Sequence, residues 1–278
     1  MVSRISPTIA RFALFLLWST PSSAFDASIL ASHFSGCPDT ASGNCQGARL
    51  INPDLAGADL SSANFADANM AGANMAGADL SGSNFFNTNL SYANMSGLQN
   101  NAYFYKSTLF RANLSDANGI VISASNASQS TIINSIIYEA SCDSDTCTDF
   151  SGATITDSQF SYNPSRGANF SGADLTNTIL GDLSCDGNRC TNLSGANLTN
   201  AWIGNCSGAN FFRANLSGAH ISDFGGDCSE ANFYLANLSN AHLNSGNFYG
   251  SNFDGTTLSG AELGDMKNST FRYADFSG

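Results

Sequence analysis

The sequence contains little basic charge and few charged residues of either sign. Its 278 residues include 10 Lys and Arg against 22 Asp and Glu, and charged residues make up 12% of the chain. The net charge at neutral pH is therefore −12. Because a nucleic-acid-binding groove needs clustered basic side chains, this composition argues against nucleic acid as a partner.

Long apolar runs are missing as well. The N-terminal run from Phe12 to Trp18 is far shorter than the roughly 20 residues that a membrane-spanning helix needs, so no membrane span is expected. Arg4 and Arg11 supply the positive charge of a signal peptide, and residues 22–24 fit a small-residue cleavage site. Residues 1–24 are therefore predicted to be a signal peptide. A buried N-terminal helix is the alternative interpretation.

Sequence signatures of catalysis are absent. Serine occurs throughout, but no nucleophile elbow or buried base accompanies it, so no Asp/His/Ser triad can be assigned. Asp143 and Asp145 beside Cys142 lack the sixth-place glycine and the distal glutamate of an EF-hand loop, which favours a solvated loop over a calcium site. The sequence thus predicts neither an enzyme nor a cofactor.

What the sequence does contain is a period of five residues. From Ala58 to Leu80 every fifth residue is large and apolar, an alanine stands two residues before each, and Asp or Asn lies between. A strand would put successive apolar residues on opposite faces, and an α-helix would rotate each by roughly 140°. Only a chain that turns at every unit can bury them together, so the period predicts a solenoid with coils stacked at about 4.8 Å.

The period also excludes the other interpretation of a composition rich in Gly, Ser and Asn, which is disorder. These residues are turn formers, and a turn is what each five-residue unit needs. The strict apolar spacing continues through most of the chain and reaches Phe276.

These residues resemble the pentapeptide-repeat family, whose consensus is A(D/N)LxxA(D/N)Lxx. The resemblance implies an all-β fold, a right-handed quadrilateral parallel β-helix with four pentapeptides per coil and about ten coils over residues 49–278. It also implies that the large central residue and the preceding Ala or Ser point inward. The expected core centres are Leu60, Phe65, Met70, Met75, Leu80, Phe85, Leu90, Phe170, Leu175, Leu198, Leu216, Phe233, Leu238, Leu243, Phe248 and Phe253.

Residues 25–48 precede the regular repeats and are predicted to form an N-terminal cap. Phe25 to Phe34 has apolar residues at helical spacing, so we expect a short capping helix that covers the open edge of the first coil. Cys37 and Cys45 flank a turn-rich loop and are expected to form a disulfide that fixes the cap. The repeat loses its phase at residues 98–103 and again before Ile132, where we expect bulges or short loops but no domain boundary.

Two similar segments, each containing Cys-x4-Cys, occupy eight residues where five would serve. They predict local disulfides between Cys142 and Cys147 and between Cys185 and Cys190. With four units per coil, the two loops fall on one face, two coils and about 10 Å apart. That separation is too large for four thiolates to share a zinc ion or an iron–sulfur cluster, so disulfides are favoured.

Cys206 and Cys228 are four units apart and should occupy the same place in neighbouring coils. Stacked positions about 4.8 Å apart lie within the usual Cα separation of a disulfide, so a bond between these two coils is predicted. Eight cysteines in four pairs, together with an export signal, indicate an oxidising compartment: the periplasm, the extracellular space or a thylakoid lumen.

Two further features could carry a function. His220, His242 and Glu262 should form an outward column, able in principle to bind a metal or to respond to pH, although stacked surface residues arise readily in a repeat. Phe271, Tyr273 and Phe276 lie beside the final edge at Gly278, where no capping segment is expected. This edge is the expected surface for a homodimer through the C-terminal coil or for a partner, and simple exposure is the alternative.

Taken together, the sequence predicts an exported, disulfide-stabilised, non-enzymatic scaffold that binds an unidentified protein. The family resemblance implies an alternative, an acidic DNA-mimicking rod that binds a type II topoisomerase, although an export signal does not suit a cytoplasmic target. A metal-binding module built on the cysteine loops or the histidine column is a third hypothesis.

Overall fold

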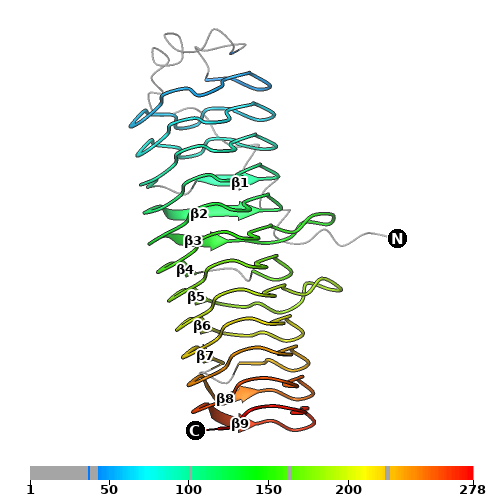
Figure 1. Cartoon of the computed structure of the whole chain (residues 1–278). Coiled ribbons are helices and arrows are strands. Elements are labelled where there is room, and N and C mark those ends of the chain that lie inside the picture. Colours follow the sequence, from blue (N-terminus) through cyan, green and yellow to red (C-terminus); the bar gives the residue numbers. More distant parts are fainter. Residues whose placement is uncertain (1–36, 38–42, 100–101, 162–164, 223–225, 278) are drawn as a thin grey trace, which may run out of the picture.

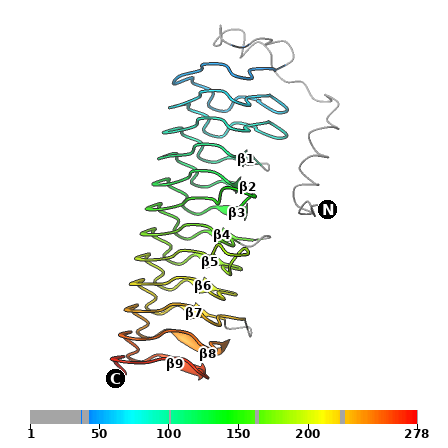
Figure 2. The ribbon, with the colours of Figure 1, turned by 90° about the vertical axis from the view of Figure 1, so that its right-hand side faces the viewer.

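The computed structural model describes residue 37 and residues 43–99, 102–161, 165–222 and 226–277. This part of the chain winds into a tall solenoid, seen from two directions in Figures 1 and 2. Its strands form one parallel nine-stranded sheet in chain order, so each coil adds one strand below the last. The strands are β1 (Tyr103–Tyr105), β2 (Asn118–Ser123), β3 (Ile136–Glu139), β4 (Gln159–Phe160), β5 (Ile179–Leu180), β6 (Trp202–Ile203), β7 (His220–Ile221), β8 (His242–Asn247) and β9 (Glu262–Asp265).

Isolated parallel bridges build the other sides of the coil. In the first coils these bridges join residues twenty apart, as in Asn44 with Asn64 and Asp54 with Asn74. Four units of five residues make twenty, so the expected all-β coil with four units per turn is confirmed. One ladder of bridges follows the whole solenoid through Arg49, Asn69, Asn89, Thr108, Asn126, Asp149, Asn169, Asn192, Asn210, Asn232, Asn252 and Thr270.

Most corners are tight turns in which the residue two places after the core centre has a positive φ. Ser62 has φ 61°, and Ala63 N–H closes the turn by donating to Leu60 O over 3.1 Å. Glycine adopts this conformation without strain, which explains its frequency at corners, as at Gly77 with φ 64°. The period of five in the sequence is therefore a period of turns.

Asparagines just before the core centres form ladders along the solenoid. Asn64 Nδ2 donates to Asn44 Oδ1 over 3.2 Å, and Asn84 Nδ2 donates to Asn64 Oδ1 over 3.1 Å. Asn64 Oδ1 also accepts the N–H of Ala66, two residues on, over 3.2 Å. Each amide thus connects one coil to the next and also fixes its own turn.

The interior is a column of large side chains separated by small ones. All sixteen expected core centres are buried, and the small residues two places before them, mostly alanine, fill the remaining space. Aromatic rings at equivalent places stack: the centroids of Phe211 and Phe233 lie 4.8 Å apart, and those of Phe233 and Phe253 also lie 4.8 Å apart. Such packing buries large apolar area in a narrow cross-section.

The phase slips appear as local irregularities of the same solenoid. The pairing of β2 with β3 shifts register between Asn118 and Ile120, at Gly119 with φ 81°. The predicted signal peptide (1–24) and capping helix (Phe25–Phe34) lie outside the described residues. Within the described ranges there is no helix at all, and hence none of the length and apolar character that a membrane span requires.

Candidate functional site

The strand-bearing face carries an outward column of rings in its C-terminal half. The first residue of each strand from β5 to β9 points outward, and parallel pairing puts Trp202 beside His220 and His220 beside His242. His242 in turn pairs with Glu262. The predicted alignment of His220, His242 and Glu262 is thus present in the structure.

The rings of this column stack closely. The centroids of Trp202 and His220 lie 4.0 Å apart with an interplanar angle of 6°, and those of His220 and His242 lie 4.4 Å apart at 10°. His242 Nδ1 lies 3.1 Å from Glu262 Oε2, which also accepts a hydrogen bond of 2.9 Å from Asn244 Nδ2. Sequence reasoning missed Trp202, although the same counting of units, continued toward the N-terminus, leads to it.

The column does not gather the ligands of a metal. Among the residues that the structure describes, no group of three or more His, Cys, Asp or Glu side chains could hold an ion. Parallel stacking points the two imidazole rings side by side rather than toward a common point. The metal hypothesis for His220, His242 and Glu262 therefore gains no support from their geometry.

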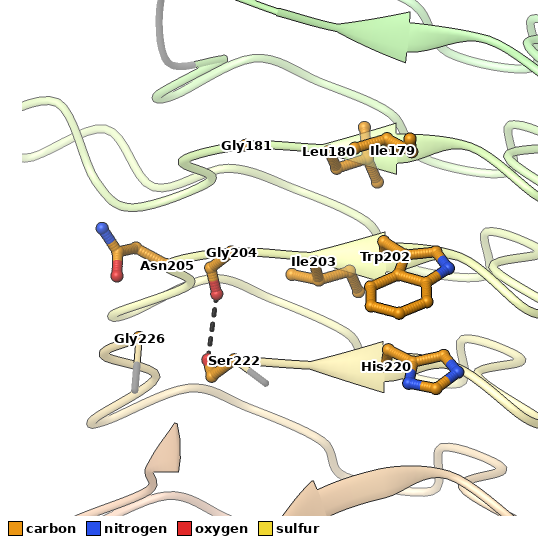
Figure 3. Close-up of a pocket in the computed structure, with 10 residues that line it drawn as sticks. All are labelled: Ile179, Leu180, Gly181, Trp202, Ile203, Gly204, Asn205, His220, Ser222 and Gly226. Atoms are coloured by element: carbon orange, nitrogen blue, oxygen red, sulfur yellow. Dashed lines mark hydrogen bonds between the residues drawn. The ribbon is translucent and has the colours of Figure 1, made fainter. Parts of the chain in front are cut away.

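A shallow groove of about 430 Å³ lies beside this column (Figure 3). Its floor is formed where glycines stack: a Cβ on Gly204 would lie 2.5 Å from Gly181 O, so a side chain there would separate the coils. Ser222 Oγ donates to Gly204 O over 2.9 Å at the lower edge. The lining residues are Ile179, Leu180, Gly181, Trp202, Ile203, Gly204, Asn205, His220, Ser222 and Gly226.

The eight cysteines form four disulfides, and the pairs are those that the spacing predicts. Within the two corner loops, Cα atoms lie 3.9 Å apart for Cys142–Cys147 and 3.8 Å apart for Cys185–Cys190. The cap and core pairs, Cys37–Cys45 and Cys206–Cys228, have Cα separations of 4.2 and 4.3 Å. The core pair joins neighbouring coils, since Cys206 N–H donates to Asp227 O in the next coil.

The two corner loops project from the same corner, two coils apart. Each loop precedes the same long ladder, in which Asp149 pairs with Asn169 and Asn169 with Asn192. Between them lies Gly167, where a Cβ would meet Cys142 Sγ at 2.8 Å and Arg189 Cβ at 3.3 Å. Only glycine fits between the loops at this point.

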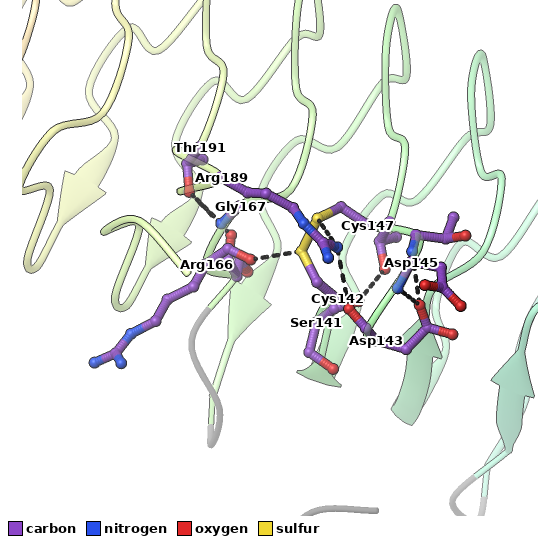
Figure 4. The surroundings of a disulfide bond; sticks show 12 residues. Ser141, Cys142, Asp143, Asp145, Cys147, Arg166, Gly167, Arg189 and Thr191 are labelled. Atoms are coloured by element: carbon purple, nitrogen blue, oxygen red, sulfur yellow. Dashed lines mark hydrogen bonds between the residues drawn. A yellow bond between two sulfur atoms is a disulfide. The ribbon is translucent and has the colours of Figure 1, made fainter. Parts of the chain in front are cut away.

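Arg189 of the second loop reaches back to the first (Figure 4). Its Nη1 donates to Asp143 O over 3.0 Å, and its Nη2 donates to Ser144 O. Sequence reasoning placed the two loops too far apart for four thiolates to share a metal, and it did not anticipate a contact between the loops. A long side chain spans that gap and makes the two loops one unit.

Asp143 is the electrostatic centre of this unit. Its carboxylate accepts N–H groups from Thr146 (2.6 Å) and Asp145 (2.8 Å), and it also binds Lys106 Nζ at 2.9 Å and Tyr105 OH at 3.0 Å. Burial alone would raise the pKa of Asp143, but these donors outweigh it and lower the pKa to about 2. The loop therefore carries a fixed negative charge at any neutral or mildly acidic pH.

The C-terminal coil exposes large apolar side chains, as the sequence suggested. Tyr273 is 95% exposed, Phe276 is 52% exposed and Leu263 is 37% exposed. Phe271 stacks on Phe253 with centroids 5.0 Å apart and contacts Phe276 at 5.7 Å, so this end continues the aromatic core to the surface.

Comparisons with known proteins agree with this architecture. The family model of pentapeptide repeats matches in eight copies, over residues 44–82, 63–97, 189–223 and 231–265. No curated protein matches the chain.

Three solved structures of other proteins are similar to this chain. HetL, a pentapeptide repeat protein involved in heterocyst differentiation regulation from the cyanobacterium Nostoc sp. strain PCC 7120, is 21% identical, with 91% of this chain and 95% of HetL covered and a TM-score of 0.27. Full-length QnrB1, a plasmid-mediated fluoroquinolone resistance protein, is 15% identical, with 63% and 92% covered and a TM-score of 0.31. Rfr23 from the cyanobacterium Cyanothece 51142 is 20% identical, with 64% and 90% covered and a TM-score of 0.20.

The TM-scores of these three structures are too low to carry an argument about function. The family assignment therefore rests on the matched repeats and on the coil that they build. Both have the same origin, a turn at every fifth residue with a large side chain buried between turns. The chain is a pentapeptide-repeat protein.

Proposed function

We propose that this protein is an exported, disulfide-stabilised, non-enzymatic scaffold for protein interaction or structural support. The observation that supports the proposal is the filled interior: core centres such as Leu60, Phe150 and Leu238 are completely buried from one end of the described solenoid to the other. The side chains that a partner could meet therefore lie on outer faces and corners. Stacked repeats give rigid extended surfaces of this kind.

Departures from the repeat supply distinct features on that surface. The paired corner loops, the Trp202–His220–His242 column and its groove interrupt otherwise uniform ladders of Asn, Asp and Ser. Recognition commonly resides on irregular segments held by a rigid framework.

The proposed export rests on the cysteines and on the N-terminus. All eight cysteines are paired, and disulfides persist in oxidising compartments such as the periplasm, the extracellular space or a thylakoid lumen. The predicted signal peptide (1–24) would direct the chain there.

The test is expression of the full chain in a bacterial host with a periplasm, fractionation with immediate thiol alkylation, and mass mapping. We expect a periplasmic product that begins near Phe25 and carries four bridged, unalkylated cysteine pairs. A cytoplasmic product that retains Met1 and has eight alkylated cysteines would disprove export.

The proposal includes a homodimer through the C-terminal coil, supported by the exposure of Leu263, Tyr273 and Phe276. Light scattering coupled to size exclusion should show twice the mass of the mature chain, and Tyr273→Ser with Phe276→Ser should restore the monomer. A monomer at all concentrations in the unaltered protein would remove this part of the proposal.

The acidic-rod alternative is favoured only by the net charge of −12 and the tall narrow shape. The chain without residues 1–24, added to a DNA gyrase supercoiling reaction, separates it from the scaffold. Inhibition at stoichiometric concentration would favour the alternative, and unchanged supercoiling would favour the scaffold.

A further inference from the structure

One corner of the solenoid departs from its own repeat. In the middle coils the two residues after the core centre are Ser and Gly, as at Ser171-Gly172 and Ser194-Gly195. The next two coils replace this pair with Phe212-Arg213 and Tyr234-Leu235, and the last coil has Arg272. We call Phe212, Arg213, Tyr234, Leu235 and Arg272 the corner stripe.

Backbone hydrogen bonds show that these residues stack in successive coils. Gly195 N–H donates to Phe212 O over 2.8 Å, and Arg213 N–H donates to Tyr234 O over 3.1 Å. Leu235 N–H then donates to Asp254 O, and Gly255 N–H donates to Arg272 O. The corner stripe thus follows one vertical row of corners, in which Asp254 and Gly255 stand between Leu235 and Arg272.

The corner stripe is maintained against the preference of the backbone. Arg213 and Leu235 have φ values of 56° and 59°, at the place where Gly172 and Gly195 have 64° and 66°. A large side chain is strained in this left-handed region, whereas glycine is not. Other corners of the solenoid also accept non-glycine residues in this conformation, for example Tyr92 (φ 63°) and Gln129 (φ 56°), so the turn tolerates the large side chains of the corner stripe at a cost in stability.

The side chains form an ordered exposed surface. Tyr234 is 42% exposed and Leu235 is 39% exposed. The ring of Tyr234 stacks on that of Phe212 with centroids 5.8 Å apart, and Arg213 Cζ lies 4.9 Å over the Phe212 ring. The side chain of Leu235 packs over Gly255, where an added Cβ would lie only 2.7 Å from Leu235 Cδ2. Aromatic and arginine side chains are the types enriched at protein interfaces.

The exposed charges of this surface indicate the charge of its partner. Arg213 and Arg272 are exposed, and neither forms an ion pair with a described residue. Asp254 lies between them, and its Oδ1 accepts the backbone N–H of Arg272 over 2.8 Å. The corner stripe therefore presents an arginine at each end, with Tyr234 and Leu235 next to Arg213 and with Asp254 next to Arg272, in a molecule whose net charge is −12.

The spacing fits an extended peptide. Arg213 and Arg272 lie three coils apart, which is about 14 Å at strand spacing, with Arg213 at the second place after its core centre and Arg272 at the first. In an extended segment, residues i, i+2 and i+4 share one face and span about 13 Å. A carboxylate at each end of such a segment would meet the two arginines while the middle side chain lies on Tyr234 and Leu235.

We propose that the corner stripe binds an extended acidic protein segment of the pattern acid–x–apolar–x–acid. This inference rests on the proposed role as an interaction scaffold and names the chemistry of the partner. It is independent of export, because the contact uses only the folded solenoid.

The test is fluorescence polarisation of the purified, oxidised protein with a labelled peptide that carries Glu-Ser-Trp-Ser-Glu between Gly-Ser linkers. We expect measurable binding, with Kd below about 1 mM, that weakens with added salt. Replacing Glu by Lys, or lengthening the spacing to Glu-Ser-Ser-Trp-Ser-Ser-Glu, should weaken binding about tenfold or more.

The variant Phe212→Ser, Arg213→Gly, Tyr234→Ser, Leu235→Gly restores the sequence of the middle coils. It should bind the peptide at least about tenfold more weakly while melting at an equal or higher temperature, because glycine relieves the strained turns. The matched control Phe110→Ser, Arg111→Gly alters the same motif at the same corner, away from the corner stripe. It should leave peptide binding unchanged.

Absence of binding, or equal binding by the Lys peptide or by the corner-stripe variant, would overturn the proposal. Conversion of a dimer to a monomer by that variant would assign the surface to a second copy of the chain and would also overturn it. The outcome of the peptide titration does not depend on the outcome of the export experiment. If the full chain stays in the cytoplasm, export is disproved, but peptide binding by the purified, oxidised protein still tests the corner stripe.

Discussion

The coils before residue 98 and those after residue 140 build the same cross-section in different ways. In the first region each coil takes twenty residues, and ladder partners such as Asn64 and Asn84 are twenty apart. In the second region ladder partners are 23 residues apart for Asn169 and Asn192, and 18 apart for Asn192 and Asn210. The ladders keep their pairing, and the corners absorb the difference in length.

The second region also contains three of the four disulfides and most of the stacked phenylalanines. The first region depends on an uninterrupted repeat with mainly Leu and Met at its centre, together with the stacked pair Phe65 and Phe85. The coils of unequal length are thus the ones that contain most of the disulfides and stacked phenylalanine rings. We infer that the disulfides and rings stabilise coils whose corners are interrupted by extra residues.

The largest expected effect comes from removing a stacked ring. Phe233→Ala should lower the free energy of unfolding by about 4 kcal/mol, because it leaves a cavity between Phe211 and Phe253. Met70→Ala in the regular region should cost about 3 kcal/mol, since the thioether is smaller and its neighbours adjust. Urea unfolding followed by circular dichroism measures both, and an equal or reversed order would contradict the contrast between the regions.

Loss of the disulfide between coils should come next. Cys206→Ala with Cys228→Ala opens a loop of 22 residues and should cost about 3 kcal/mol by loop entropy. Cys142→Ala with Cys147→Ala opens a loop of only 5 residues and should cost about 2 kcal/mol. Denaturant midpoints of the oxidised proteins test this order. A larger loss of unfolding free energy for the short loop would show that the corner loops stabilise the fold more than the bond between coils does.

Asp143 should make the second region sensitive to acid. Its folded pKa of about 2 lies below the ordinary value of 3.8, so its contribution is complete above about pH 4 and is lost as the pH falls from 4 to 2. Asp143→Asn should cost about 2 kcal/mol at pH 7 and flatten the stability curve between pH 4 and 2. The exposed Asp145→Asn, which keeps the backbone donor, is the control and should retain that slope.

Arg189 should give the smallest effect. Arg189→Met removes the contacts with Asp143 O and Ser144 O and should cost about 1 kcal/mol, mostly as local opening of the corner loops. Hydrogen exchange of residues 142–147 should become faster. Arg49→Met in the regular region is the control, and equal exchange in both variants would mean that the two loops are independent.

Most of the fold could be predicted because the period of five carries it. One large residue per unit, one turn per unit and four units per coil locate Leu60 and Phe253 in the core without any knowledge of contacts. The same counting located Cys206 opposite Cys228. Counting is reliable here because parallel pairing keeps equivalent units in register across coils.

The candidate sites were less predictable because they depend on long side chains that contact residues outside their own position in the repeat. The count placed the corner loops two coils apart, but it could not indicate that Arg189 reaches across Gly167 to Asp143. Trp202 was within reach of the count that found His220, yet a single tryptophan in a strand suggests burial until its neighbours are known. Signal peptide and cap remain predictions from the sequence.

The asparagine ladders give the molecule an electrical direction. In the asparagine ladders Oδ1 accepts the N–H two residues along its own turn, and Nδ2 donates to the preceding coil, as in Asn64, Asn84 and Asn232. Aspartates at Asp54 and Asp149 continue the rule, because they can only accept. Side-chain dipoles therefore add head to tail from coil to coil, and a donor approaching the C-terminal end meets a different field from one approaching the N-terminal end.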